Sequence, residues 1–174
     1  MKKTKLRFST KIIAEIATFV ALATVLSYIK IFALPQGGSV TAASMVPILW
    51  LALRRGPKVG FFAATLYGIV QLATGPYIVH PAQLLLDYPV AFGVLGVAGF
   101  FQKRPYTGII LGIIGRFFAH FFSGIIFFHS FAPEGMNSAI YSVVYNGGYL
   151  LVELVIAIYI IYLLQASKVL KIYM

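Results

Sequence analysis

Residues 138–165, SAIYSVVYNGGYLLVELVIAIYIIYLLQ, hold a single charged side chain, Glu153. A membrane-spanning helix needs about 20 consecutive, mostly apolar residues. This stretch exceeds that length, and a basic segment with Lys168 and Lys171 follows it. The stretch therefore predicts a transmembrane helix.

The rest of the chain has the same character. Of its 174 residues, 60% are hydrophobic and 10% are charged, and the mean hydropathy is +0.92, whereas soluble domains have about 25% charged residues. We predict an all-α integral membrane protein with six transmembrane helices, forming a single membrane domain over residues 1–174. The other five apolar segments, separated by Gly, Pro and charged residues, are 10–33, 41–53, 57–74, 82–101 and 106–130.

The first two segments leave alternatives open. Ala21-Leu22-Ala23 resembles a signal-peptide cleavage site, but the apolar run continues to Leu34, and this length favours a retained helix. The second segment is short for a bilayer core of about 30 Å. Either it begins within the loop Gly37-Gly38-Ser39, or that loop dips into the protein.

Basic residues are distributed asymmetrically. The net charge is +10, and threading six helices back and forth places all but two of the 14 Lys and Arg residues on one face. The exceptions are Lys30, on the opposite face, and Arg116, within a helix. Because Lys and Arg are retained on the cytoplasmic face, we predict that both termini are cytoplasmic. The clustered residues are Lys2, Lys3, Lys5, Arg7, Lys11, Arg54, Arg55, Lys58, Lys103, Arg104, Lys168 and Lys171.

Composition and motifs exclude several functions. Clusters of basic residues between apolar segments fit anionic lipid head groups in the bilayer rather than nucleic acid. The chain has no cysteine, which excludes disulfides, thiolate metal sites and cysteine catalysis. Gly37-Gly38 and Gly147-Gly148 lack the spacing of a phosphate-binding loop, so the chain itself does not hydrolyse ATP.

Polar residues within the spans indicate a binding site. Counting depth along the predicted helices places Asp87, His120 and Asn146 together in the outer half of the membrane, where each is costly unless it faces a cavity or a partner. Gly124, one turn from His120, is expected to leave open space. A carboxylate surrounded by rings suits a flat organic cation. The aromatic residues at this level are Tyr77, Tyr88, Phe128 and Tyr141.

These residues also have structural interpretations. Tyrosines are common at membrane boundaries, Asp87 can stabilise a helix N-terminus, and His120 can simply join two helices by a hydrogen bond. Arg116 and Glu153 fall at similar depths in the inner half, and we predict that they form a buried ion pair.

The first span contains a strip of small side chains. Ala17 and Ala21 form a small-xxx-small pair, extended by Ala14 and Thr24, and such a strip lets another helix approach closely. The strip packs either against the rest of the protein or against another membrane subunit.

With these motifs, the chain resembles the thiamine-specific substrate-binding (S) components of energy-coupling factor (ECF) transporters, a bacterial family of ABC type. The matching segments extend over most of the chain, in order and at similar spacing. They are 34–39 LPQGGS, 47–58 PILWLALRRGPK, 75–81 GPYIVHP, 86–89 LDYP, 120–124 HFFSG, 132–135 APEG and 141–147 YSVVYNG.

The resemblance implies a six-helix fold in the bacterial plasma membrane, with a thiamine pocket near the extracellular side and no metal or cofactor. Asp87 matches the acidic residue of the pocket, and Ala17 and Ala21 match the surface that docks on a transmembrane coupling subunit. That subunit and two ATPase subunits supply the power. His120, Tyr141 and Asn146 match polar contacts, Tyr77 and Tyr88 match aromatic contacts, and Gly124 and Phe128 complete the wall.

Two departures from the family pattern are visible. Some relatives have tryptophans in the outer loops, whereas the single tryptophan here, Trp50, is predicted near the opposite face. Phe128, or its neighbour Phe127 or Phe131, would have to stack on the ligand instead. Some relatives also have glutamate at the position of Asp87, which is one methylene longer.

Three functional interpretations follow. The first is high-affinity capture of thiamine, with the Gly37-Gly38 loop as a candidate lid. The second is an S component for another vitamin or a thiamine precursor. The third is a small intramembrane enzyme that uses Asp87 and His120 as acid and base, although no nucleophile elbow or metal-ligand spacing accompanies that pair.

Overall fold

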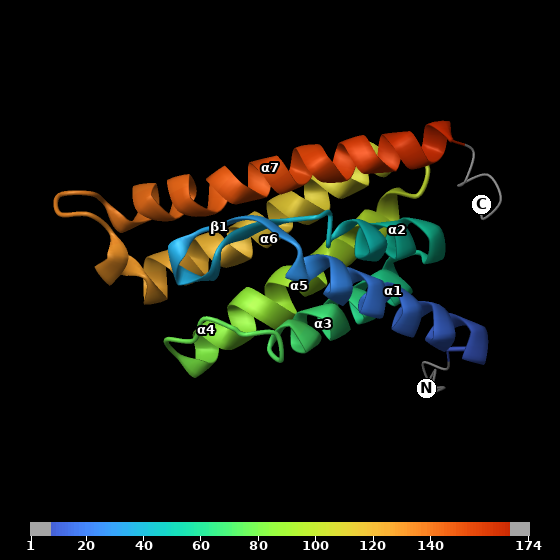
Figure 1. The fold of residues 1–174 in the computed structure, drawn as a ribbon, viewed down its shortest axis with the longest axis horizontal. Helices are drawn as coiled ribbons and strands as arrows, with labels where there is room; N and C mark the ends of the chain where they lie inside the picture. The colour runs from blue at the N-terminus through green and yellow to red at the C-terminus, as the bar shows by residue number, and fades with distance from the viewer. Residues whose placement is uncertain (1–7, 168–174) are drawn as a thin grey trace, which may run out of the picture.

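The structure is a computed structural model that describes residues 8–167. The basic residues of segments 1–7 and 168–174, namely Lys2, Lys3, Lys5, Arg7, Lys168 and Lys171, lie outside the described residues. The described chain is an elongated bundle of helices in which α6 and α7 run side by side along the long axis (Figure 1). The principal helices are α1 (Thr10–Tyr28), α2 (Val46–Arg55), α3 (Pro57–Gln71), α6 (Pro105–Phe127) and α7 (Ser138–Ala166), with a further helical segment over 81–101.

Four of the described helical segments are long and apolar enough to cross a membrane: α1, Pro81–Phe101, α6 and α7. Helices α2 and α3 have 10 and 15 residues, short for a bilayer core of about 30 Å. The structure is therefore that of a helical membrane protein, while six crossings remain a prediction.

The segment after α1 is not helical, and here the all-α prediction was wrong. The helix expected over 10–33 ends at Tyr28, and β1 (Lys30–Ala33) pairs with β2 (Ser39–Thr41) in an antiparallel hairpin. The short helical turn η1 (Pro35–Gly37) joins the strands, with positive φ at Gln36 (58°) and Gly37 (90°). Proline and two left-handed residues cannot continue a helix, so the chain reverses. The loop does dip into the protein, because its residue Gly38 and the following Val40 and Thr41 are buried.

The helical segment 81–101 changes geometry along its length. It begins as α4 (Pro81–Leu85), widens into the π-helical turn η2 (Leu86–Val90), and continues through α5 (Ala91–Gly93) into the 3-10 segment η3 (Val94–Phe101). Pro89 lies inside η2 and lacks the N–H that a regular helical turn requires. Asp87 thus lies in the wide turn.

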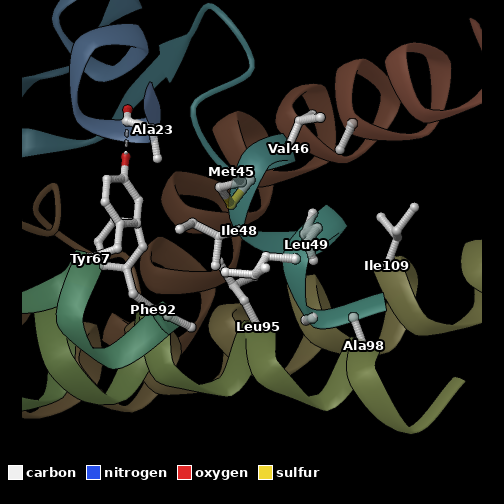
Figure 2. Close-up of a cluster of buried hydrophobic side chains, with 14 of the residues drawn as sticks. Ala23, Met45, Val46, Ile48, Leu49, Tyr67, Phe92, Leu95, Ala98 and Ile109 are labelled. Carbon is white, nitrogen blue, oxygen red and sulfur yellow. Dashed lines mark hydrogen bonds between the residues drawn. The ribbon is translucent and has the colours of Figure 1, made fainter. Parts of the chain in front are cut away.

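The hydrophobic core surrounds α2. Ile48, Leu49 and Leu51 are fully buried, and Figure 2 shows Ile48 and Leu49 among side chains of the neighbouring helices. Tyr67 of α3 donates a hydrogen bond to the carbonyl oxygen of Ala23 in α1 (3.4 Å), which the same view shows. This packing closes the interior on one side of the polar residues described below.

The described basic loops gather at one end of the bundle. Gln102, between η3 and α6, donates to the carbonyl oxygen of Arg54 at the end of α2 (3.3 Å). Glu15 of α1 accepts two hydrogen bonds from Arg55, the one from Nε at 2.6 Å. The first turn of α1 and the last turn of α7 lie at this same end (Figure 1), as an even number of crossings requires.

Candidate functional site

A cavity of about 170 Å³ opens between the hairpin, η2, α6 and α7. Every residue that the sequence singled out for ligand binding lines it, although these residues come from four separate segments of the chain. They are Tyr77, Asp87, Tyr88, His120, Gly124, Phe128, Tyr141 and Asn146. The structure thus brings the predicted residues together, while their role in binding a ligand stays a prediction.

Asp87 is the acidic centre of this cavity and is 9% exposed. Its Oδ2 accepts hydrogen bonds from Gln83 Nε2 (2.7 Å) and Ser123 Oγ (2.9 Å), and its Oδ1 lies 2.9 Å from His120 Nδ1. A carboxylate has about four acceptor positions, so three are occupied and one is left for a ligand. The three donors fix the carboxylate in place.

Arg116 determines the tautomer of His120. Its Nε donates to His120 Nε2 (3.2 Å), so that nitrogen is the acceptor and Nδ1 has the hydrogen that it donates to Asp87. The histidine is therefore neutral and holds both partners. Its ring cannot act as a free base while these two bonds persist.

The predicted ion pair between Arg116 and Glu153 was wrong. Arg116 instead contacts Met45 Sδ through Nη1 (2.7 Å) and lies 4.0 Å from the centre of the Phe92 ring. Glu153 accepts hydrogen bonds from the hairpin residue Thr41. Similar depth in the membrane did not make the two charges partners, because the base of the hairpin reaches Glu153.

Aromatic rings form one wall of the cavity. Tyr77 and Phe128 have ring centres 6.0 Å apart, and Phe131 packs behind both, at 6.3 and 5.8 Å. Tyr88 accepts a hydrogen bond from the Tyr77 backbone N–H at its hydroxyl oxygen (2.9 Å). Of the three phenylalanines considered in place of a loop tryptophan, Phe128 lines the cavity. Phe127 stacks on His80 instead (5.1 Å).

Gly124 does not leave open space, contrary to the prediction. Ser142 of α7 occupies that position so closely that a β-carbon at Gly124 would overlap its side chain. The glycine lets α6 and α7 approach, and Asn146 then donates from Nδ2 to the His120 carbonyl oxygen (3.3 Å) and to Ser142 Oγ (3.1 Å). Gly124 therefore shapes the wall by closing it.

The hairpin covers the cavity and is attached to α7 at both ends. At its tip, the Tyr145 hydroxyl accepts from the Gly38 N–H (3.0 Å) and donates to the Pro35 carbonyl oxygen. At its base, Thr41 is bound to Glu153. This covering position agrees with the lid predicted for the Gly37-Gly38 loop, and its movement remains a prediction.

Several lining residues were missed by the sequence analysis, although helical spacing could have indicated them. Gln83 lies one turn before Asp87, and Ser123 lies three residues after His120, so each shares a helix face with a predicted residue. On α7 the same spacing connects Asn146 to Ser142, Tyr149 and Glu153, and it connects Tyr141 to Tyr145. The hairpin residues had no such signal.

The alanine strip of α1 faces outward. Ala17 and Ala21 are exposed, whereas Ile16, Val20 and Ala23 are buried against the bundle. The alternative in which Ala17 and Ala21 pack inside the protein is therefore wrong, and the strip is open to lipid or to another helix.

In chemical terms, the cavity combines a fixed carboxylate, hydrogen-bonding groups and ring faces. Within residues 8–167 there is no group of three or more His, Asp or Glu side chains that could hold a metal ion. The arrangement suits an organic cation with a flat ring, because the rings and Asp87 both stabilise positive charge.

Comparison with known proteins identifies the family. The model of the thiamine transporter protein family (Thia_YuaJ) matches residues 13–172. The chain belongs to this family. The thiamine transporter ThiT of Bacillus subtilis is 36% identical over 90% of this chain and 92% of its own length. That of Lacticaseibacillus paracasei is 32% identical over 86% and 84%.

A solved structure agrees with this assignment. ThiT from Listeria monocytogenes superposes with a TM-score of 0.84 at 28% identity, covering 91% of this chain and 94% of that chain. The resemblance found in the motifs is confirmed, and the chain is a multi-pass protein of the bacterial plasma membrane. Because the family consists of transporters, the prediction that the chain is not an enzyme is also confirmed.

Proposed function

We propose that this protein binds thiamine in the cavity around Asp87 and is the S component of an ECF transporter. The observation that supports this most directly is the carboxylate itself. Asp87 is buried, is fixed by three donors and has one acceptor position left beside aromatic rings. The thiazolium ring of thiamine is positively charged and provides the counter-charge for the Asp87 carboxylate.

The remainder of the ligand has matching partners. Tyr141, Asn146 and His120 provide polar groups for the aminopyrimidine ring, and Phe128 with Tyr77 and Tyr88 provides ring faces for stacking. Gly124 brings α7 close enough for Asn146 to join this group. The hairpin with Gly37 and Gly38 covers the ligand and excludes water, which strengthens the electrostatic contacts.

Transport requires other subunits, because the sequence has no phosphate-binding loop. We propose that α1 docks on a transmembrane coupling subunit through Ala17 and Ala21, and that two ATPase subunits bound to it supply the energy. The outward orientation of these alanines supports a docking surface. In this arrangement six crossings place both termini, Arg54, Arg55 and the loop before α6 in the cytoplasm.

The test of the binding role is calorimetric titration of the purified protein with thiamine, beside its pyrimidine and thiazolium fragments. We expect one-to-one binding of thiamine, with each fragment weaker. Folded protein that binds neither thiamine nor its fragments would contradict the proposal and direct the search to other vitamins. Topology is tested by single-cysteine variants of Lys103 and Glu134, because the chain has no cysteine. We expect label from outside the cell to reach position 134 and not 103.

A further inference from the structure

Glu153 is a second buried carboxylate in the same cavity, and it has an unused hydrogen-bonding position. It lies on α7 and is 3% exposed. Its Oε1 accepts from the backbone N–H of Thr41 (2.6 Å) and from the Thr41 hydroxyl (2.7 Å). Its Oε2 has no hydrogen-bond partner among the residues that the structure describes.

An unpaired buried carboxylate oxygen costs free energy, and no basic side chain within residues 8–167 donates a hydrogen bond to it. Arg116 lines the same cavity, but its hydrogen bonds go to His120 and Met45. The Thr41 contacts fix the carboxylate on one side only. Oε2 is itself buried, but Glu153 lines the cavity, so a ligand in the cavity reaches this oxygen by a shift of the side chains beside it.

The position of Glu153 shows which level of the cavity it lines. Asn146, Tyr149 and Glu153 follow one face of α7 and all line the cavity. Seven residues at 1.5 Å each place Glu153 about 10 Å beyond Asn146 along the helix. Asp87 and Asn146 thus belong to one level of the cavity, and Glu153 belongs to the level nearer the core around α2.

We propose that Glu153 is a distinct polar subsite, in which Oε2 accepts a hydrogen bond from a neutral N–H or O–H group of the bound ligand. A neutral donor fits better than a second cation, because the Arg116 guanidinium lines the same cavity and repels positive charge. This inference rests on the proposed function. Thiamine has two such donors, the amino group of its pyrimidine ring and the hydroxyl group of its side chain.

The test combines the variant Glu153→Gln with ligands that lack one donor each. Glutamine keeps an oxygen for Thr41 and places an amide NH₂ where the free oxygen lies. The two analogues have an oxo group in place of the pyrimidine amino group, or hydrogen in place of the hydroxyl group. Calorimetry gives the affinity of wild type and variant for thiamine and for both analogues, and Glu134→Gln is the matched control at an exposed acid.

We expect Glu153→Gln to weaken thiamine binding about 10-fold to 100-fold, the effect of a hydrogen bond to a charged group. For one of the two analogues, the affinities of wild type and variant should lie within about twofold of each other. The donor group that this analogue lacks is then the one that Glu153 recognises. Equal loss for thiamine and both analogues would show a structural role and overturn the inference, as would unchanged thiamine affinity.

A second variant covers the case in which glutamine prevents folding. Glu153→Asp keeps the charge but withdraws it by one methylene, and it should produce the same selective loss. Suppose that wild type binds thiamine through Asp87, but that neither analogue reduces the effect of the Glu153 variants on affinity. In that case this inference fails and the proposed function stands. If wild type binds none of the three ligands, the proposed function fails with it.

Discussion

The central prediction concerns Asp87→Asn, which removes one charge while nearly preserving the shape of the side chain. Asp87 accepts three hydrogen bonds, at 2.7, 2.9 and 2.9 Å. An asparagine oxygen in the Oδ2 position keeps Gln83 and Ser123 as donors. Its NH₂ group then faces His120 Nδ1–H, and because both groups are hydrogen-bond donors, the hydrogen bond between the two residues is lost.

The cost to binding follows from the lost charge. A hydrogen bond to a charged group contributes about 1.5–3 kcal/mol, and a unit pair at 4 Å attracts by about 4 kcal/mol at an effective dielectric constant of 20. A loss of about 2–4 kcal/mol lowers the affinity for thiamine about 30-fold to several hundred-fold. The conflict with His120 lowers stability by about 1–3 kcal/mol, which thermal unfolding without ligand measures separately.

Ser123→Ala is the matched control. It removes one of the three donors from Asp87 but keeps the carboxylate charge, so it tests the network without testing the attraction. Calorimetry should show a loss of thiamine affinity well below that of Asp87→Asn. Equal losses in the two variants, or wild-type affinity in Asp87→Asn, would refute the assignment of Asp87 as the counter-charge.

Three further predictions concern the surroundings of the site. Gly124→Ala should destabilise the protein by about 1–3 kcal/mol, because the added methyl overlaps Ser142; in the double variant with Ser142→Gly, thermal unfolding should return toward wild type. Tyr145→Phe should accelerate dissociation of thiamine in stopped-flow measurements, because the hairpin tip loses its hydrogen bonds to α7. Replacing Ala17 and Ala21 by Trp should abolish co-purification with the coupling subunit, whereas thiamine affinity stays unchanged because the strip lies outside the cavity.

The parts of the site that could be predicted from the sequence are those that lie on regular helices. Depth along a helix is 1.5 Å per residue, so counting from the helix ends was enough to bring Asp87, His120 and Asn146 to one level. The cost of polar groups in lipid made these few residues conspicuous. Packing distance could not be predicted in this way, and Gly124 was therefore assigned to open space that Ser142 fills.

The hairpin was the main structural feature that the sequence did not predict. The run from Ile29 to Leu34 is apolar except for Lys30 and continues the first span, so hydropathy alone assigned it to a helix. Non-helical backbone at this depth is tolerated where it is buried in protein or lines a cavity. The strands satisfy this condition through their mutual pairing and through Glu153 and Tyr145 of α7.

This hairpin also explains why the inner charges were paired wrongly. In a bundle of helices alone, Arg116 and Glu153 at similar depth would be each other's best partners. The base of the hairpin places the N–H and hydroxyl groups of Thr41 against Glu153, while Met45, where α2 begins, meets Arg116. Glu153 is thus held by the hairpin that covers the ligand cavity, whereas Arg116 is held by Met45, four residues after the hairpin. Movement of the hairpin would change the surroundings of Glu153, so opening of the cover and loss of the contact between Glu153 and the ligand are expected to occur together.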